Sequence, residues 1–584
     1  MQLASEAALA SRDDLEQYGS NAHLLFALQL HEGIEDIHSI AADALTDHAN
    51  DKKCDLVYID EEQSVAIIAQ GYYSAKQRAA APCQKASDLS TATTWVLSPD
   101  LETLPIPLRS AAEQLQDALA RNAIERLEIW YVHNLPESEN VRRELDKVEE
   151  AAAALLARSY AKNKITPHTR EIGAKTIERW YQRTRTPILV TESFSFETSG
   201  GFWEEGTSWK AYATSLPASW LAEQYKKHGK RLFTANVRDY LGSRKSDKNI
   251  NHNIKTTASE TPENFWAYNN GVTALVNEMR ATSEDGSGLL EIEGIAIVNG
   301  AQTTGSLGSV ADANALENAR VQVRFIKCQD TATIQRIIQY NNSQNKVEAA
   351  DFRSNDDHQR RLRDEFRQLK FVEYRGGRRG GEEDKIRRPR AEIPSASAGQ
   401  ALAAFHGKPG VAYNKKSEIW VSDRLYSEFF HPGTSAQHIL FTFSLVRAIE
   451  SWKSELRALS TDKMTEAQRR QRAFSDKRGS IYLLATAVAA CLESILGRPI
   501  PNRFRLGFNK NVKSLDQAIE TWQAILPRMA AFVHVLSPAL ARGNLRESDS
   551  NKTEKSLNDF QSLVSATIEQ IPEQFSDFRA KTSS

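Results

Sequence analysis

The chain has 584 residues, of which 41% are hydrophobic and 26% charged, as expected for a globular protein with a sizeable core. This length exceeds what one hydrophobic core supports and predicts several domains. Its 74 Lys and Arg and 75 Asp and Glu give a net charge of -1, which excludes a protein whose whole surface binds polyanions. Any polyanion site is therefore local.

The charge is distributed unevenly along the chain. Residues 1–60 contain twelve acidic and three basic residues, a net charge of -9. Residues 375–390 contain seven basic and three acidic residues, a net charge of +4. An acidic N-terminal part tolerates a metal site but repels a nucleic-acid backbone. We therefore expect a polyanion to be held by residues 375–390 or by a partner subunit.

The first 165 residues alternate helical and strand-like patterns, which predicts an α/β domain. An amphipathic helix or a helix pair is expected first, then two short strands joined by a tight turn, which form a hairpin. A helix, a third strand and a long helix follow. The expected segments are 21–49, 55–60, 64–70, 109–122, 127–132 and 141–158.

Residues 166–360 predict a second, mixed α/β domain. It begins with a segment rich in Gly, Ser and Trp at 193–209. Helices and strands follow at 219–228, 271–276, 289–298, 321–326 and 333–342. Residues 361–435 read as a basic loop and connector, and 436–584 as mostly helical.

One apolar helix face is expected in the C-terminal region, formed by Ile439, Leu440, Phe443, Val446 and Ile449. The region either packs internally or forms a homodimer seam, and the large chain favours internal packing.

The cysteine and hydropathy patterns indicate the compartment. Cys54, Cys83, Cys328 and Cys491 stand far apart, so neither a disulfide framework nor a cysteine zinc site is indicated. The first residues lack the basic start and apolar core of a signal peptide, and no apolar run is long enough to span a bilayer. We expect a cytoplasmic protein with no membrane partner.

Three polar clusters follow strand-like runs, at 265–273, 297–304 and 340–346. Their Asn, Gln and Thr side chains satisfy ligand groups without adding charge. A helix starting after Asn299-Gly300 would offer backbone N–H groups to an anion. The alternative is a simple Asn-Gly turn followed by Thr303 as an N-cap.

Four ordered segments resemble the motif set of the AIPR (abortive infection phage resistance) family. They are LFTANVRDYLG at 232–242, FWAYNNGVT at 265–273, IVNGAQTT at 297–304 and NNSQNKVEAADF at 341–352. The resemblance implies a bacterial antiviral role that harms or arrests the infected cell in response to a phage-derived trigger. The candidate ligand-binding residues in these segments are Asn236, Arg238, Asn269, Asn270, Asn299, Gly300, Gln302, Thr303, Thr304, Asn341, Asn342, Gln344 and Lys346.

The stretch from Asn299 to Asn342 is distantly similar to ParB/sulfiredoxin-type domains. Those domains place a Gly-x-x-Arg turn at a nucleotide phosphate. Here the turn runs from Gly300 to Thr303 and lacks the arginine. A nucleotide is therefore an expected ligand, with Arg238 or Lys346 as the cation for its phosphates.

Asp55 and Gln70, at the ends of the predicted hairpin strands, resemble the metal site of the PD-(D/E)xK nuclease fold in its Mrr-like form. The resemblance implies Mg²⁺ or Mn²⁺ held by these two side chains and a lysine beside them. Tyr72 occupies the lysine position, and the nearest lysine is Lys76. The domain is therefore either a metal-dependent nuclease with catalytic Asp55, Gln70 and Lys76 or a degenerate relic. For Asp55 and Gln70 considered alone, the alternative is that both are ordinary polar residues at strand ends with no metal-binding role.

Arg378, Arg379, Arg387 and Arg388 lie in the basic segment 375–390 and are candidate contacts to DNA or RNA. The alternative is a solvated loop balanced by its own acidic residues. The sequence thus leaves two principal functions open. One is a defence nuclease controlled by ligand or nucleotide binding in the central domain. The other is a non-catalytic sensor of a nucleotide or phage component. Hydrolysis of a nucleotide by the central domain ranks last, because no general base is identifiable.

Overall fold

The computed structural model describes residues 3–46, 52–76, 78–160, 165–185, 188, 190–233, 247–281, 287–310, 313–328, 330–342, 353, 356–374, 391–540, 545–546 and 550–583. Its contacts divide the chain into two compact units. The central unit consists mainly of Glu178–Val347, and the larger unit combines Leu9–Ile177 with most of the chain after Glu348. Two of the boundaries between them fall within α1 (Ala4–Ala10) and α7 (Ala174–Arg185).

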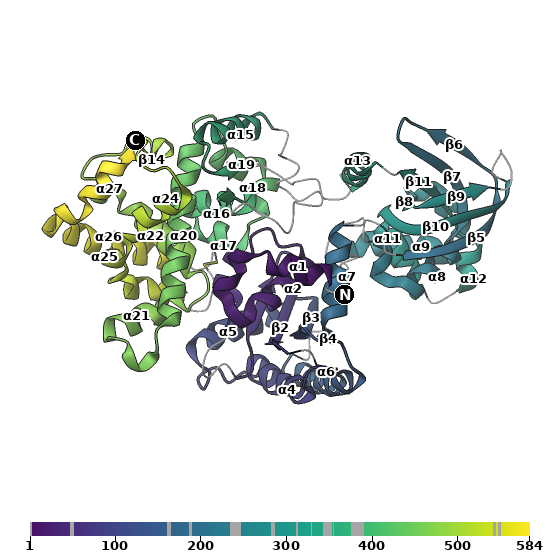
Figure 1. Ribbon diagram of the computed structural model, residues 1–584, viewed down its shortest axis with the longest axis horizontal. Coiled ribbons are helices and arrows are strands. Elements are labelled where there is room, and N and C mark those ends of the chain that lie inside the picture. The colour runs from purple at the N-terminus through teal and green to yellow at the C-terminus, as the bar shows by residue number, and fades with distance from the viewer. Residues whose placement is uncertain are drawn as a thin grey trace. The chain divides into compact units, whose positions relative to one another are not determined.

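The N-terminal part of the larger unit is a four-stranded sheet with helices on both faces (Figure 1). Strand β1 pairs antiparallel with β2, whereas β2, β3 and β4 run parallel. The hairpin predicted from the alternating apolar residues is confirmed. The elements are α2 (Ala22–Glu32), α3 (Ile37–Ala44), β1 (Leu56–Asp60), β2 (Val65–Tyr72), α4 (Cys83–Leu97), α5 (Ile106–Ala120), β3 (Arg126–His133), α6 (Glu139–Ser159) and β4 (Pro167–Ile172).

The C-terminal part of the larger unit is almost entirely helical, as the sequence predicted. Its helices are α15 (Asp357–Leu369), α16 (Ser395–Phe405), α17 (Pro409–Asn414), α18 (Glu418–Val421), α19 (Asp423–Phe429), α20 (Ala436–Ala458), α21 (Glu466–Ser475), α22 (Ser480–Ala490), α23 (Leu492–Leu496), α24 (Leu515–Gln523), α25 (Leu526–Ala530), α26 (Ser550–Gln570) and α27 (Ser576–Lys581). Two short strand pairs join them, β12 (Glu373–Tyr374) with β13 (Glu392–Ile393) and β14 (Gly507–Phe508) with β15 (Thr582–Ser583).

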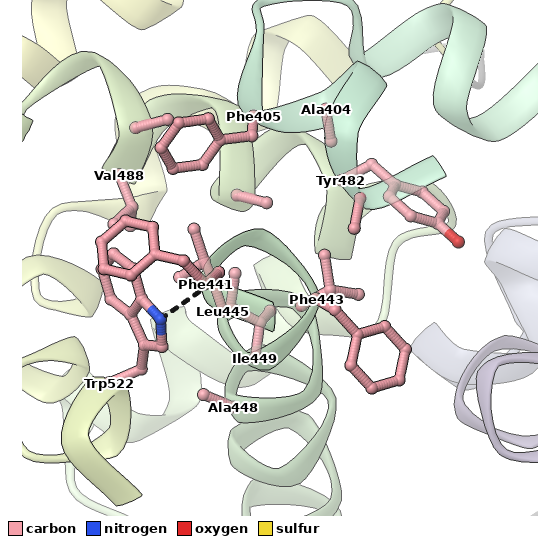
Figure 2. Packing of buried hydrophobic residues seen from close by; sticks show 14 of the residues in the cluster. Ala404, Phe405, Phe441, Phe443, Leu445, Ala448, Ile449, Tyr482, Val488 and Trp522 are labelled. Atoms are coloured by element: carbon pink, nitrogen blue, oxygen red, sulfur yellow. Dashed lines mark hydrogen bonds between the residues drawn. The ribbon is translucent and has the colours of Figure 1, made fainter. Parts of the chain in front are cut away.

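Helix α20 forms the centre of this helical part and is buried on most of its circumference. The five predicted apolar positions of α20 are all buried, and further residues of the helix are buried as well, because neighbouring helices cover α20 from several sides. Figure 2 shows Phe441 beside Trp522 and Phe405, with Phe443 directed elsewhere from the same helix. The indole nitrogen of Trp522 donates to the Phe441 carbonyl at 3.1 Å, so this large ring is fixed without an unsatisfied polar atom.

Acidic residues of the N-terminal part dock onto basic residues of the helical part. Asp36 accepts from the guanidinium of Arg447 at 2.6 Å, and Arg447 also binds Glu450 at 2.6 Å. Burial raises the pKa of Asp36, but the neighbouring Arg447 outweighs it and holds that pKa below its usual range. Asp43 binds Lys453, whose side chain is only 1% exposed.

Further contacts extend this docking face. Asp60 binds Lys416 at 2.6 Å, and the Ser417 hydroxyl donates to Glu62 at 2.7 Å. The buried guanidinium of Arg478 donates to the Val57 carbonyl and to Gln114. Several acidic residues that give residues 1–60 their net charge of -9 thus hold two parts of the chain together.

The central unit is built on a seven-stranded sheet with the order β5-β10-β8-β11-β7-β6, and β9 pairs with β10. Only β11 and β8 are parallel among its pairs of described strands. The elements are β5 (Val190–Ser199), β6 (Gly201–Glu205), β7 (Trp209–Pro217), α8 (Ala218–His228), α9 (Asp247–Glu260), α10 (Phe265–Tyr268), β8 (Val272–Val276), β9 (Glu278–Ala281), β10 (Ser287–Asn299), α11 (Ala301–Gly308), α12 (Ala313–Asn318), β11 (Arg320–Cys328) and α13 (Thr331–Asn342).

Helices cover the two faces of this sheet unequally. Helices α8, α9, α11 and α12 bury apolar residues against one face. On the other face, Ile334, Ile337 and Ile338 of α13 pack against a smaller apolar cluster. The Gly, Ser and Trp-rich segment at 193–209 forms β5, β6 and the start of β7, elements that its composition did not predict. The mixed α/β class and the helical C-terminal region are both confirmed.

Within the described ranges, no helix is both long and apolar enough to cross a membrane. All four cysteines carry free thiols.

Two buried imidazoles meet in the helical part. The Nε2 atoms of His406 and His438 lie 2.9 Å apart, and His438 Nδ1 lies 2.9 Å from the Leu506 carbonyl. Because a carbonyl only accepts, Nδ1 carries the hydrogen of His438 and its Nε2 accepts from His406. Burial lowers the pKa of His438 to about 4 and that of His406 to about 2.

We predict that Arg447→Met destabilises the larger unit by about 3–5 kcal/mol, because Asp36 and Glu450 stay buried without their cation. Arg143→Met is the matched control, since the Arg143–Glu139 side chains are 72% and 69% exposed and such pairs contribute little. Urea unfolding followed by circular dichroism measures both. Equal midpoints for Arg447→Met and the wild type would contradict the docking role.

We also predict that stability falls on acidification, from about pH 6.5 towards about pH 4. The folded-state pKa of His438 lies below the ordinary imidazole value, so the unfolded chain binds the proton first and stability rises with pH. His438→Asn keeps a donor for the Leu506 carbonyl but does not titrate. Between about pH 8 and about pH 5 the wild type should lose about 2 kcal/mol more than this variant. Parallel pH profiles would rule out His438 as the titrating group.

Candidate functional site

The parallel strands β2, β3 and β4 end at one edge of the N-terminal sheet, at Tyr72, His133 and Ile172. The carboxyl edge of parallel strands is where open α/β sheets bind ligands. Asp55 and Gln70 lie beside one another here. The Asp55 N–H donates to the Ala69 carbonyl at 3.0 Å, and its carboxylate accepts from the Gly71 N–H at 2.6 Å.

Gln70 is the unusual residue at this edge. It is only 3% exposed, and within the described ranges its Oε1 atom has no hydrogen-bond partner. A buried amide oxygen without a partner costs about 1–3 kcal/mol, so an uncompensated one calls for an explanation. One explanation is a ligand that supplies the missing partner.

His23 of α2 approaches the same edge. A Cβ atom added at Gly71 would lie 3.5 Å from His23 Cε1 and 3.6 Å from Asp55 Oδ2, so both side chains border that glycine. His23 Nε2 lies 3.3 Å from the Val132 carbonyl. Burial lowers the pKa of His23 to about 4, which leaves the imidazole neutral at pH 7. Sequence reasoning missed His23, because one histidine in an apolar helix carries no signal of its position.

Tyr72 and the predicted catalytic residue Lys76 lie at the end of β2 and in the loop that follows it. Tyr72 ends β2 and packs partly against the core of the sheet. Lys76 lies in the loop that follows, and its side chain is exposed. The Ser74 hydroxyl donates to the Lys76 carbonyl at 2.7 Å, and Ser74 is tied through its backbone to Asn134.

The donor set at this edge fits a divalent cation in part. Asp55 and Gln70 offer two oxygen ligands of the kind that Mg²⁺ or Mn²⁺ prefers. Among the residues with described positions, however, no group of three or more His, Cys, Asp or Glu side chains is suitably arranged for a metal ion. Waters or substrate phosphates would therefore have to complete the coordination of a cation held by Asp55 and Gln70.

The central sheet brings the three polar clusters together at Arg324. Cross-strand pairing sets Asn299 opposite Thr273 and Thr273 beside Arg324. The Arg324 guanidinium donates to the Thr273 hydroxyl at 3.1 Å and to the Asn341 side-chain oxygen at 2.8 Å. We call Asn269, Asn270, Thr273, Asn299, Arg324 and Asn341 the Arg324 cluster.

Two glycines allow the backbone to pass closely at this cluster. Gly271 has φ +73°, and a Cβ atom there would lie 2.5 Å from the Gln322 carbonyl. Gly300 has φ +93°, and its Cβ would lie 2.8 Å from Val272 Cγ2. Both positions therefore require glycine for conformation and for space.

Helix α11 begins at Ala301 with Gly300 as its N-cap, so Thr303 lies inside the helix and its alternative interpretation as an N-cap was wrong. The Thr304 hydroxyl is buried and donates to the Gly300 carbonyl at 3.0 Å, so it serves the helix itself. Gln302 is half-buried in the first turn. The N–H groups of the first turn of α11 have no carbonyl acceptor within the helix, as in every α-helix.

The other candidate residues are distributed differently. Asn269 donates its amide to the Phe265 carbonyl at 3.0 Å, and Asn270 is exposed. Asn342 is the last residue of α13, and only its backbone is among the described parts of the chain. Asn236, Arg238, Gln344, Lys346, Arg378, Arg379, Arg387 and Arg388 lie outside the described residues.

Arg324 is the residue that sequence reasoning overlooked in this cluster. It interrupts the apolar strand VQVRFI with a charge, which is the signal that could have drawn attention to it. Arg324 provides a guanidinium on β11, beside β8.

The fold defines a multi-unit α/β protein with a polar cluster at the centre of its seven-stranded sheet. The AIPR protein family model matches residues 233–569, which is more than half of the chain. The protein therefore belongs to the AIPR family, and this membership assigns it to abortive-infection phage resistance. The match excludes the β1–β4 sheet with Asp55 and Gln70. No curated protein and no solved structure matches the chain.

Proposed function

We propose that this defence protein acts through a phosphate-containing ligand, bound at the Arg324 cluster. The observation that carries the proposal is the exposed guanidinium of Arg324, fixed by Thr273 and Asn341 between three polar clusters from different strands and helices. A guanidinium binds phosphate oxygens in a forked geometry. The amides around it recognise neutral polar groups of the same ligand.

The positioning of Arg324 favours a binding role over a purely structural one. Its two partners are a neutral hydroxyl and a neutral amide, and no acidic side chain in the described part of the chain forms an ion pair with it, whereas Lys327 on the same strand is paired with Glu278 at 2.7 Å. An exposed guanidinium held by neutral groups keeps its charge available to an anion. A nucleotide or a phosphate-bearing phage component has the required chemistry.

We predict that Arg324→Ala weakens the binding of ATP and of inorganic pyrophosphate by about 10- to 100-fold, the value of a charge-assisted hydrogen bond. Arg324→Lys should recover part of the affinity, because it keeps the charge but loses the fork. Isothermal titration calorimetry measures both.

The matched control is Arg280→Ala. Arg280 is exposed on β9, where the strand register sets it opposite Glu291 of β10, away from the cluster. A plaque assay in cells expressing each variant at equal level should show lost protection for Arg324→Ala alone. Unchanged phosphate affinity in Arg324→Ala would exclude this binding site.

A second function, metal-dependent phosphodiester cleavage at Asp55 and Gln70, is supported by the buried Gln70 oxygen that lacks a partner. A divalent cation held there would offset the charge of a substrate phosphate. Asp55 and Gln70 would hold it, neutral His23 would border it, and Lys76 would approach from the exposed loop. Tyr72, in place of the usual lysine, argues instead for the alternative of a relic fold with no cleavage.

We predict that, if this edge cleaves nucleic acid, Asp55→Asn lowers the Mn²⁺- or Mg²⁺-dependent rate by at least about 100-fold. Asparagine retains an acceptor for the Gly71 N–H, so the loss would report the missing charge. Glu139→Gln on α6 is the control, since that side chain is 69% exposed. Plasmid, linear DNA, single strands and RNA are the substrates. Equal rates in the wild type and Asp55→Asn would assign any cleavage to a contaminant. The alternative of a relic nuclease fold without activity would then remain.

A further inference from the structure

Three exposed aromatic side chains lie on β6 and α10, in the same unit as the Arg324 cluster. Among the residues that the structure describes, four Phe, Trp or Tyr side chains are more than half exposed, and three of them are Phe202 at 59%, Trp266 at 51% and Tyr268 at 68%. Large exposed rings that gather at one place mark an interaction site. A ligand with both aromatic and anionic groups would match these rings together with the charged Arg324 cluster.

The register of the sheet places Phe202 in one row with the cluster. Phe202 pairs with Ala213, Ala213 with Arg324, Arg324 with Thr273, and Thr273 with Asn299. Directly paired residues project from the same face of a sheet. Phe202 is thus two strands away from Arg324, a separation of about 10 Å.

Trp266 and Tyr268 lie on α10, the short helix that precedes β8. Helix α10 buries Phe265 and leaves its other two rings exposed, and Asn269 follows at once. Tyr268 precedes Thr273 by five residues, so at most about 18 Å of chain separates the two positions. Trp266 and Tyr268 thus stand on the chain segment that leads into the cluster.

We propose that the ligand of the Arg324 cluster is a single-stranded nucleic acid, with bases stacked on Phe202, Trp266 and Tyr268 and a phosphate bound by Arg324. This inference rests on the proposed phosphate-binding function and names its ligand class. Every base has a face that stacks on an aromatic ring, and a guanidinium between such rings binds the backbone. Asn269, Asn270 and Asn299 offer both donors and acceptors to the edges of unpaired bases.

The exposure of the rings favours a strand over a single nucleotide. Small ligands obtain their affinity from concave sites that enclose most of their surface. Here the three rings are more than half exposed; Phe202 is two strands away from Arg324, and Trp266 and Tyr268 lie on α10, which precedes β8. A strand reaches all of them with successive nucleotides. A duplex hides the faces of its bases and cannot stack on them.

The test measures the affinity of the full-length protein for fluorescein-labelled single-stranded DNA and RNA, for a duplex of the same sequence, and for ATP and pyrophosphate. Phe202→Ala, Trp266→Ala and Tyr268→Ala should each weaken single-strand binding by about 5- to 100-fold, the value of one stacked base. Trp266→Phe and Tyr268→Phe should remain within about 3-fold of wild type, because the ring is kept. None of these five variants should change pyrophosphate affinity.

Arg324→Ala should weaken both single-strand and pyrophosphate binding and lower the salt dependence by about 0.7 in the slope of log K against log salt, the value of one phosphate. Leu289→Ala, an exposed apolar residue on β10 that is 37% exposed, is the control. Strands carrying 5-bromouracil should crosslink on irradiation to peptides containing residues 201–205 and 265–268.

Two results separate this inference from the proposed function. Aromatic variants with wild-type single-strand affinity, or crosslinks confined to other peptides, would overturn the nucleic-acid inference, and pyrophosphate binding that depends on Arg324 would still support the phosphate site. Preference for ATP over any strand would likewise overturn it in favour of a mononucleotide. If Arg324→Ala leaves both pyrophosphate and strand binding unchanged, the phosphate site and the inference both fail.

Discussion

The buried contact between Asp36 and Arg447 is the constraint on which the larger unit depends. Removing two charges from water costs several kcal/mol per ion, and only close, hydrogen-bonded partners offset that cost. Arg447 meets this condition with Asp36 on one side and Glu450 on the other, both at 2.6 Å. Ser39 and Ser397 donate to the same two carboxylates. The helices and the β1–β4 sheet are thereby held in one arrangement, because any displacement would leave a buried charge without a partner.

This docking gives the acidic N-terminal segment a structural purpose. Asp36, Asp43 and Asp60 are each matched by a cation of the helical part, so their charge is used within the chain. The acidic composition is therefore no evidence for a metal site. What supports a ligand at the carboxyl edge is instead the buried Gln70 oxygen near Asp55, which has no hydrogen-bond partner among the described residues. In the central unit the corresponding feature is a cation, Arg324, held by neutral groups.

Local patterns predicted much of the fold. The hairpin of β1 and β2, the long helix α6 and the strands β8, β10 and β11 follow from apolar periodicity, since burial of one face or of a whole strand is written in the residues themselves. Strands β5 and β6 were missed, because the sheet supplies the partners that a Gly, Ser and Trp-rich segment lacks alone. Helix α20 was assigned one apolar face, because periodicity does not reveal how many neighbours surround a helix.

The candidate sites divide in the same way. The sequence by itself determined the family motifs, the three polar clusters, and the neighbouring strand ends of Asp55 and Gln70, all of which are short-range features. Only the tertiary structure decided that Arg324 joins those clusters, that Phe202 lies in its row, and that Asp36, Asp43 and Asp60 meet cations of the helical part. The physical reason is that strand register and ion pairing bring together residues separated by tens to hundreds of positions, and no local pattern encodes which partners will meet.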